Sequence, residues 1–179
     1  MKGKVIIIRL PRNILIVTLF FLLLPTISLA GQFTVTRVYD GDTIKAKGYD
    51  IEIKVRLVGI DAPETSKNKR DPGQPYSQQS KKYLTELVLN KTVDVKGYGL
   101  DPYSRVLGIV FLNGNNINLE MVKAGLAEVY RGKPPHGFDL DQYLRAEEEA
   151  RKARIGMWNL GNKYISPMDW RMIERGTNK

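Results

Sequence analysis

The order of predicted strands and helices is the feature that most restricts how this 179-residue chain can fold. Ile51, Ile53 and Val55 alternate with charged residues, and this period of two is typical of a strand with one buried face. Segments rich in β-branched and aromatic residues predict four more strands, at residues 33–39, 43–46, 92–98 and 106–112. Strands come first and helices mostly last, which predicts an α+β fold, mainly β, with a closed or partly closed five-stranded barrel and helices packed at one end.

Apolar spacing and stop signals predict three helices, at residues 77–89, 119–124 and 140–154. Asn118 is the expected cap of the second helix, and Gly125 is expected to end it. After the third helix the chain is expected to be irregular and polar, apart from Trp158 as a packing anchor. We therefore expect one domain over residues 31–160 and a C-terminal tail over 161–179.

The first thirty residues have the pattern of a secretory signal peptide. A basic start precedes an apolar run, and Ser28-Leu29-Ala30 supplies the small residues typical of a cleavage site after Ala30. The alternative is an uncleaved membrane anchor, but the apolar stretch contains Pro25 and is shorter than the roughly 20 residues that span a bilayer. The sequence thus predicts a secreted or periplasmic protein that begins near Gly31, has no stable membrane association after cleavage and is a monomer by default.

Composition excludes several kinds of catalytic site. The chain has no cysteine and one histidine, so disulfides, thiolate nucleophiles, cysteine-bound metals and paired-histidine sites are ruled out. His136 lies in a Pro-Pro-His-Gly segment and is expected to be exposed rather than catalytic. Four of the nine net positive charges fall in the first thirty residues, and the remaining excess modestly favours ligands that carry phosphate.

Three short clusters contain the residues best suited to catalysis. They are Asp40-Gly41-Asp42-Thr43, Arg56 with Asp61-Ala62-Pro63-Glu64, and Asp101-Pro102-Tyr103-Ser104-Arg105. Taken singly, each has an ordinary explanation: a hairpin turn, the end of a strand, and a turn with a surface arginine. Together they combine carboxylates with two arginines and indicate a site that is more than structural.

This combination suits the cleavage of a phosphodiester bond. The transition state gathers negative charge, so it requires cations such as a metal ion or guanidinium groups. Carboxylates of Asp42 and Asp61 with a backbone carbonyl favour Ca²⁺ or Mg²⁺ over zinc or copper. Glu64 could orient or deprotonate water, and arginine clamps on phosphoryl groups accelerate reactions on the order of 10³–10⁵-fold.

The three clusters, in this order and at this spacing, resemble those of the staphylococcal nuclease (thermonuclease) family. The likeness runs from about Phe33 to Trp158 and also includes Asn118-Leu119-Glu120 and Gly156-Met157-Trp158. The resemblance implies an OB-type five-stranded barrel with three helices. It also implies Ca²⁺-dependent hydrolysis of DNA and RNA with little sequence specificity, giving 3′-phosphate products.

The resemblance further implies a role for individual residues. Asp42 and Asp61 would bind one Ca²⁺ through their side chains and Ala62 through its carbonyl oxygen, with Asp40 near the metal but not on it. Glu64 would act as general base or orient water. Arg56 and Arg105 would hold the scissile phosphate, and Tyr103 would line the nucleotide pocket.

Two positions depart from the family pattern. Ala62 stands where threonine is frequent, so the carbonyl is kept and a hydroxyl is lost. Pro102 stands where the best-known member has a lysine that grips a terminal phosphate, which leaves nucleotide affinity open. Two other interpretations also remain open: a non-catalytic OB-type module that binds nucleic acid or protein, and a membrane-tethered Ca²⁺-binding adaptor.

Overall fold

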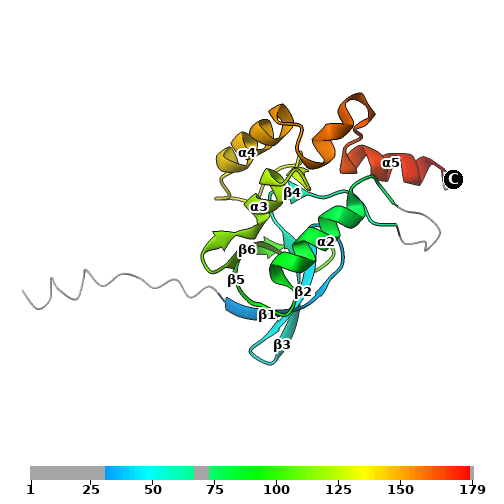
Figure 1. Ribbon diagram of the computed structural model, residues 1–179. Coiled ribbons are helices and arrows are strands. Elements are labelled where there is room, and N and C mark those ends of the chain that lie inside the picture. Colours follow the sequence, from blue (N-terminus) through cyan, green and yellow to red (C-terminus); the bar gives the residue numbers. More distant parts are fainter. Residues whose placement is uncertain (1–30, 67–72, 178–179) are drawn as a thin grey trace, which may run out of the picture.

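A computed structural model describes residues 31–66 and 73–177 of the chain (Figure 1). Its strands are β1 (Gly31–Val38), β2 (Thr43–Gly48), β3 (Ile51–Leu57), β4 (Ile60–Asp61), β5 (Thr92–Leu100), β6 (Val106–Leu112), β7 (Asn115–Asn116) and β8 (Glu128–Val129). Its helices are α2 (Ser77–Val88), α3 (Ile117–Lys123), α4 (Asp141–Lys152), the 3-10 segment η1 (Gly156–Lys163) and α5 (Pro167–Thr177). The prediction of an α+β fold with one helix between the third and fourth long strands is confirmed.

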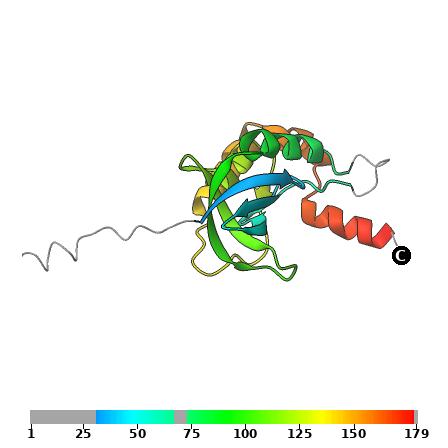
Figure 2. The same ribbon diagram turned by 90° about the horizontal axis from the view of Figure 1, so that it is seen from below.

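Five long strands close into a barrel. The sheet order is β3-β2-β1-β5-β6-β7, and an additional pairing of β3 with β6 joins the two sides of the sheet (Figure 2). This closing pair is parallel and aligns Val55 with Val106 and Arg56 with Leu107. Gly108 permits the approach, since a Cβ there would lie 3.0 Å from Val95 and 3.1 Å from Val55. The arrangement is consistent with the OB-type barrel expected from the sequence.

The barrel interior and the helices share one hydrophobic core. Alternate residues of the strands, such as Val35, Ile44 and Val55, are fully buried, as their period of two requires. The helices add buried side chains to the same cluster: Leu84 and Val88 from α2, Met121 and Val122 from α3, and Tyr143 and Ala146 from α4. This continuous packing fixes the β-turns and loops that carry the candidate site.

The expected cap of the second predicted helix was wrong by two residues. The side chain of Asn116, not that of Asn118, accepts a hydrogen bond from the Leu119 amide at 3.1 Å and caps α3. Asn118 is fully buried instead, donates to the carbonyls of Val58 and Gly108, and accepts from the Val110 amide. Asparagine satisfies backbone groups either at a cap or inside a fold, and only the tertiary position distinguishes the two.

The segment after Met157 was predicted to be irregular, and for the described residues this was wrong. It forms η1 and then α5, which lies beside the barrel in Figures 1 and 2. Ser166 and Asp169 cap α5 reciprocally, with a Ser166 hydroxyl to Asp169 carboxylate distance of 2.7 Å and an Asp169 amide to Ser166 hydroxyl distance of 3.0 Å. Pro167 occupies the first helical position, where its missing N–H is harmless. Trp158 is buried, as expected of a packing anchor.

The predicted signal peptide, residues 1–30, lies outside the described residues. Within 31–66 and 73–177, none of the helices combines the length and apolar character that crossing a membrane requires.

Candidate active site

Arg56 lies at the centre of the candidate site and joins two segments that the sequence keeps apart. Its guanidinium contacts Asp42 through Nη1 and Asp61 through Nη2, the latter at 2.6 Å. Strand pairing explains the first contact, because β2 and β3 align Thr43 with Arg56 and so place Asp42 beside the arginine. The side chain of Arg56 is 15% exposed, and those of both aspartates are almost fully buried. The structure therefore brings Asp42 and Asp61 to the same place.

Asp42 is held by a tight turn between β1 and β2. Its carboxylate accepts hydrogen bonds from the Thr43 hydroxyl at 3.0 Å and the Ala62 amide at 2.8 Å. The Asp40 carboxylate accepts from the Asp42 amide at 3.1 Å, which places Asp40 next to the site without a direct place in it. Gly41 is required here, since a Cβ would lie 1.9 Å from the Ser80 hydroxyl of α2. The turn is thus fixed by packing as well as by hydrogen bonds.

Charge and burial act in opposite directions on the pKa values of Asp42 and Arg56. Burial raises the pKa of Asp42 well above its ordinary value, against the lowering effects of Arg56 and the Ala62 amide. Burial alone would lower the pKa of Arg56, but the carboxylates of Asp42 and Asp61 outweigh it and raise that pKa. The guanidinium therefore remains charged at every physiological pH. Because the carboxylates of Asp42 and Asp61 share the single charge of Arg56, a further cation beside them would be favoured.

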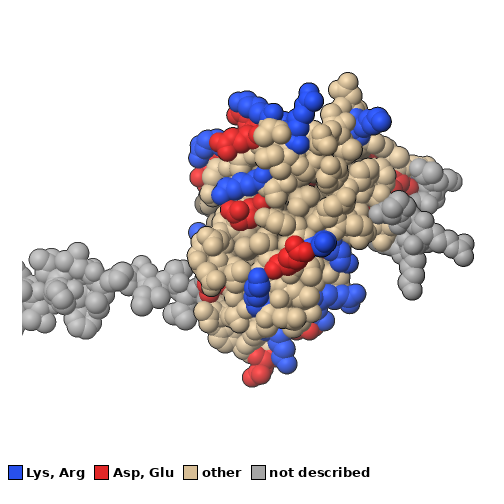
Figure 3. Space-filling model, viewed as in Figure 1, with Lys and Arg blue, Asp and Glu red and all other residues tan. Residues whose placement is uncertain are grey.

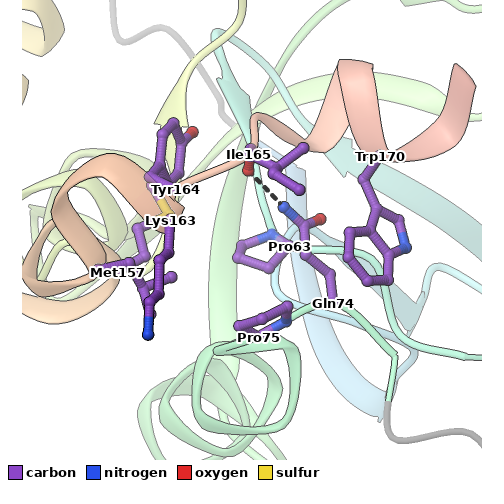
Figure 4. Close-up of a pocket in the computed structure, with 9 residues that line it drawn as sticks. Pro63, Gln74, Pro75, Met157, Lys163, Tyr164, Ile165 and Trp170 are labelled. Carbon is purple, nitrogen blue, oxygen red and sulfur yellow. Dashed lines mark hydrogen bonds between the residues drawn. The ribbon is translucent and has the colours of Figure 1, made fainter. Parts of the chain in front are cut away.

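Glu64 follows β4 and is oriented through its backbone. The Glu64 amide donates to the Gln74 side-chain oxygen at 2.9 Å, and the Gln74 amide donates to the Glu64 carbonyl at 3.0 Å. The Gln74 side-chain nitrogen donates in turn to the Ile165 carbonyl at 2.8 Å, as drawn in Figure 4. Gln74 is buried and lines a small, mainly apolar pocket with Pro63, Pro75, Tyr164 and Trp170. The sequence reasoning missed this glutamine.

Arg171 of α5 is the second residue that the sequence reasoning missed. Its Nη1 lies 2.5 Å from Glu64 Oε1 and 3.1 Å from Asp61 Oδ1, and its Nη2 lies 2.8 Å from Asp61 Oδ2. These carboxylates raise the pKa of Arg171 against the effect of burial, so the group is a permanent cation. The capping pattern at Ser166 and Pro167 could have predicted α5, but no local signal places Arg171 on Asp61.

A buried acidic residue lies behind Asp61. The short β4–β8 pairing aligns Asp61 with Glu128, which is 2% exposed. Tyr164 donates to Glu128 Oε2 at 2.7 Å, whereas Oε1 is buried without a hydrogen-bond partner among the described residues. Burial raises the pKa of Glu128, partly offset by the Tyr164 hydrogen bond and by Arg131. Glu128 therefore places a second buried carboxyl group next to Asp61, and burial makes its ionised form less favourable.

Arg105 and Tyr103 occupy the neighbouring loop. Arg105 immediately precedes β6, whose Val106 pairs with Val55, so the two predicted clamp arginines leave adjacent strands. The Arg105 guanidinium binds the Asp101 carboxylate at 2.6 Å, and its carbon lies 5.4 Å from the centre of the Tyr103 ring. Tyr103 is 76% exposed. Both residues therefore contact Asp101, and no contact of either with Asp42, Arg56 or Asp61 is found among the described residues.

The acidic side chains of this site are too few to bind a hard cation by themselves, so water or substrate would have to supply further oxygen ligands. Over residues 31–66 and 73–177, no three acidic or histidine side chains are arranged so that they could hold a metal by themselves. Asp42 and Asp61 nevertheless share the guanidinium of Arg56, and Asp61 also binds that of Arg171, so both carboxylates have cationic partners. Ala62 turns its amide toward Asp42. Carboxylate oxygens without nitrogen or sulfur suit Ca²⁺ or Mg²⁺.

One face of the described part of the molecule carries charged side chains of both signs. On the face shown in Figure 3, lysine and arginine side chains alternate with acidic ones. His136 is exposed, as predicted. Arg131 binds Glu147 at 2.6 Å in an ion-pair network that also involves Arg151. On this face the basic residues are therefore interspersed with acidic ones, whereas the candidate site contains buried carboxylates.

Comparisons with known proteins identify similar sequences. The sequence profile described as "Staphylococcal nuclease homologue" matches residues 54–160. An "Uncharacterized endonuclease" of Haemophilus influenzae is 42% identical over 143 residues, covering 79% of this chain and 73% of the relative. A "Probable endonuclease LCL3" of Komagataella phaffii is 37% identical over 127 residues, covering 68% of this chain and 55% of the relative. A protein of the same printed name from Leptosphaeria maculans is 40% identical over 114 residues, and only 38% of its length is covered.

The two fungal relatives extend well beyond the region that they share with this chain. The match to the family profile includes Arg56, Asp61, Glu64 and Arg105, and it ends before α5. Because the family profile covers more than half of the chain and the bacterial relative is similar over most of both sequences, the chain belongs to the staphylococcal nuclease homologue family.

Proposed function

We propose that this protein is a divalent-metal-dependent endonuclease that hydrolyses phosphodiester bonds of DNA and RNA with little sequence specificity. The observation that carries the proposal is the convergence of Asp42 and Asp61 on Arg56, with Glu64 beside them. Such a set suits phosphoryl transfer because it offers positive charge for the phosphate and a carboxylate for water. The relatives, which are named endonucleases, support the same activity.

The proposed metal is one Ca²⁺ ion, held by the Asp42 and Asp61 carboxylates and the Ala62 carbonyl oxygen. The all-oxygen character of these groups is the basis for choosing calcium. A cation bound there would supply positive charge that stabilises the phosphoryl transition state. The adjoining Asp40 would keep the Asp42 turn in shape through its hydrogen bond to the Asp42 amide.

The chain's own residues perform the remaining steps of the proposed reaction. Arg56 uses two of its N–H groups on carboxylates and keeps others for a phosphate oxygen. Arg105, directly before the adjacent strand β6, would leave Asp101 to contact the same phosphate. Glu64 would accept a proton from water as the water oxygen bonds to phosphorus. The bond from phosphorus to the 5′-oxygen then breaks, that oxygen takes up a proton, and a 3′-phosphate remains.

Tyr103 is proposed to contact the nucleotide. It is exposed, and its ring lies close to the guanidinium of Arg105 on the same loop. Aromatic side chains stack on bases without regard to sequence, which agrees with low specificity. We further propose that the protein acts as a monomer in the periplasm or outside the cell after removal of residues 1–30.

The decisive experiment is a nuclease assay on DNA and on RNA, with Ca²⁺ or with excess chelator, followed by identification of product ends. We expect Ca²⁺-dependent cleavage with 3′-phosphate ends. Glu64→Gln should lower turnover at least on the order of 10²-fold while the protein stays folded. Binding of nucleic acid without cleavage would favour the non-catalytic module instead, and activity unchanged by chelator would contradict the metal assignment.

A further inference from the structure

The C-terminal helix α5 lies outside the region that matches the family profile, yet it enters the candidate site. The profile ends at residue 160, and α5 begins at Pro167. Its Arg171 contacts both Asp61 and Glu64 across 110 and 107 residues of sequence. A cation from outside the matched region therefore occupies the two carboxylates assigned to the metal and to water.

The hydrogen-bonding capacity of these carboxylates is heavily used. Asp61 Oδ1 accepts from Arg56 and from Arg171, and Asp61 Oδ2 accepts from Arg171. Asp42 Oδ1 contacts Arg56 and Thr43, and Asp42 Oδ2 accepts from the Ala62 amide. A divalent ion that bound Asp61 and placed water near Glu64 would need the space and the lone pairs that Arg171 now takes. The guanidinium of Arg171 and a divalent ion therefore compete for the carboxylate oxygens of Asp61 and Glu64.

Of the two guanidinium groups, that of Arg171 is the one able to leave. Arg56 belongs to strand β3 of the barrel and its side chain is 15% exposed, whereas the Arg171 side chain is 29% exposed. On α5, Met168 and Met172 are 45% and 54% exposed, and the apolar contacts of the helix lie in its first turn, where Pro167 is buried and Trp170 lines the pocket beside Gln74. The preceding residues are anchored separately, by Tyr164 on Glu128 and by the Ile165 carbonyl on Gln74.

We propose that Arg171 is an autoinhibitory counter-ion: while α5 is docked, its guanidinium holds Asp61 and Glu64, and a divalent cation binds fully only when Arg171 withdraws. This inference rests on the proposed metal site. Withdrawal requires α5 to swing about Ser166 and Pro167, while the contacts of Tyr164 and Ile165 stay in place. Divalent-ion binding and α5 docking are then coupled, and each weakens the other.

The first test is Ca²⁺ binding to the full chain by calorimetry, without nucleic acid. We expect Arg171→Ala to bind Ca²⁺ on the order of tenfold more tightly than the unsubstituted protein. The matched control is Arg175→Ala, which removes the same charge from the next turn of α5, where the side chain is exposed. That control should stay within about twofold of the unsubstituted protein, because a surface charge acts only through a screened field.

A second measurement needs no variant. Because coupling is reciprocal, Ca²⁺ should speed hydrogen exchange of the α5 backbone amides in the unsubstituted protein. Equal Ca²⁺ affinity of Arg171→Ala and the unsubstituted protein, or α5 amides that exchange more slowly with Ca²⁺, would overturn this inference alone. If no variant binds Ca²⁺ at all, both the inference and the metal assignment fail, and the nuclease assay then shows whether the activity survives with another cation.

Discussion

The two sides of the candidate site are built in different ways. On the barrel side, Asp42 and Arg56 are 14 residues apart and are aligned by the register of two neighbouring strands. On the C-terminal side, Arg171 of α5 contacts Asp61 across 110 residues of sequence, and Ile165, just before α5, contacts Gln74 across 91. Barrel contacts are fixed by the main-chain ladder, whereas C-terminal contacts depend on how two separate elements dock. We therefore expect the barrel contacts to stay in place when ligands bind, and the C-terminal contacts to be able to rearrange.

Removing Arg56 tests the barrel side and should have the largest effect on stability. Arg56→Ala leaves two buried carboxylates facing each other without their shared cation, at a cost of about 3–5 kcal/mol in the free energy of unfolding. Denaturant unfolding measures this loss. Arg145→Ala on the exposed face of α4 removes the same charge and should change stability by less than about 0.5 kcal/mol. A loss for Arg56→Ala as small as that of the control would show that the barrel side is not held by this ion pair.

Gln74 connects the two sides, and its removal should have an intermediate effect. Gln74→Ala leaves the Glu64 amide and the Ile165 carbonyl without their partner, which should cost about 1–3 kcal/mol. Because Glu64 loses its support, we also expect turnover to fall more than substrate affinity. Steady-state kinetics separate these two quantities, with Gln78→Ala on the exposed face of α2 as the control. A change in affinity alone would mean that Gln74 does not position Glu64.

The smallest predicted effect concerns Glu128, and it depends on pH. The native state raises the pKa of this carboxyl, so it binds the proton more tightly than the unfolded chain does. Ionisation of Glu128 therefore lowers the free energy of unfolding as the pH rises above the ordinary glutamate pKa of about 4. Glu128→Gln removes that loss, and its melting temperature should exceed that of the unsubstituted protein at neutral pH, with the gap closing in acid.

The control for Glu128 is Glu148→Gln on α4. Lys152 lowers the pKa of Glu148 through a hydrogen bond, so ionisation of this exposed group does not lower stability. Replacement of Glu148 should therefore bring no gain at neutral pH. A gain of equal size in both variants would point to a general effect of net charge instead of the burial of Glu128.

The sequence predicted the barrel and the barrel side of the site because both depend on local pattern. Alternation along residues 51–57 predicts that Val55 and Leu57 face inward, as they do, although Ile51 at the start of the strand is exposed; the Asp-Gly-Asp turn places Asp42 directly before β2. The prediction that Asn118 caps the helix was wrong, because an asparagine near a helix start has the same local sequence pattern whether it caps the helix or bonds to buried backbone groups. The helix α5 was missed although Ser166 and Pro167 mark its start.

Residue identities and spacing alone therefore determined the five strands, the order of the elements and the acidic and basic groups available for chemistry. The tertiary structure alone decided that Arg171 and Gln74 belong to the site, and that Glu128 lies beneath it. The physical reason is that strand register follows from neighbours along the chain, whereas the docking of a terminal helix depends on a sum of weak, distant contacts that no short segment encodes.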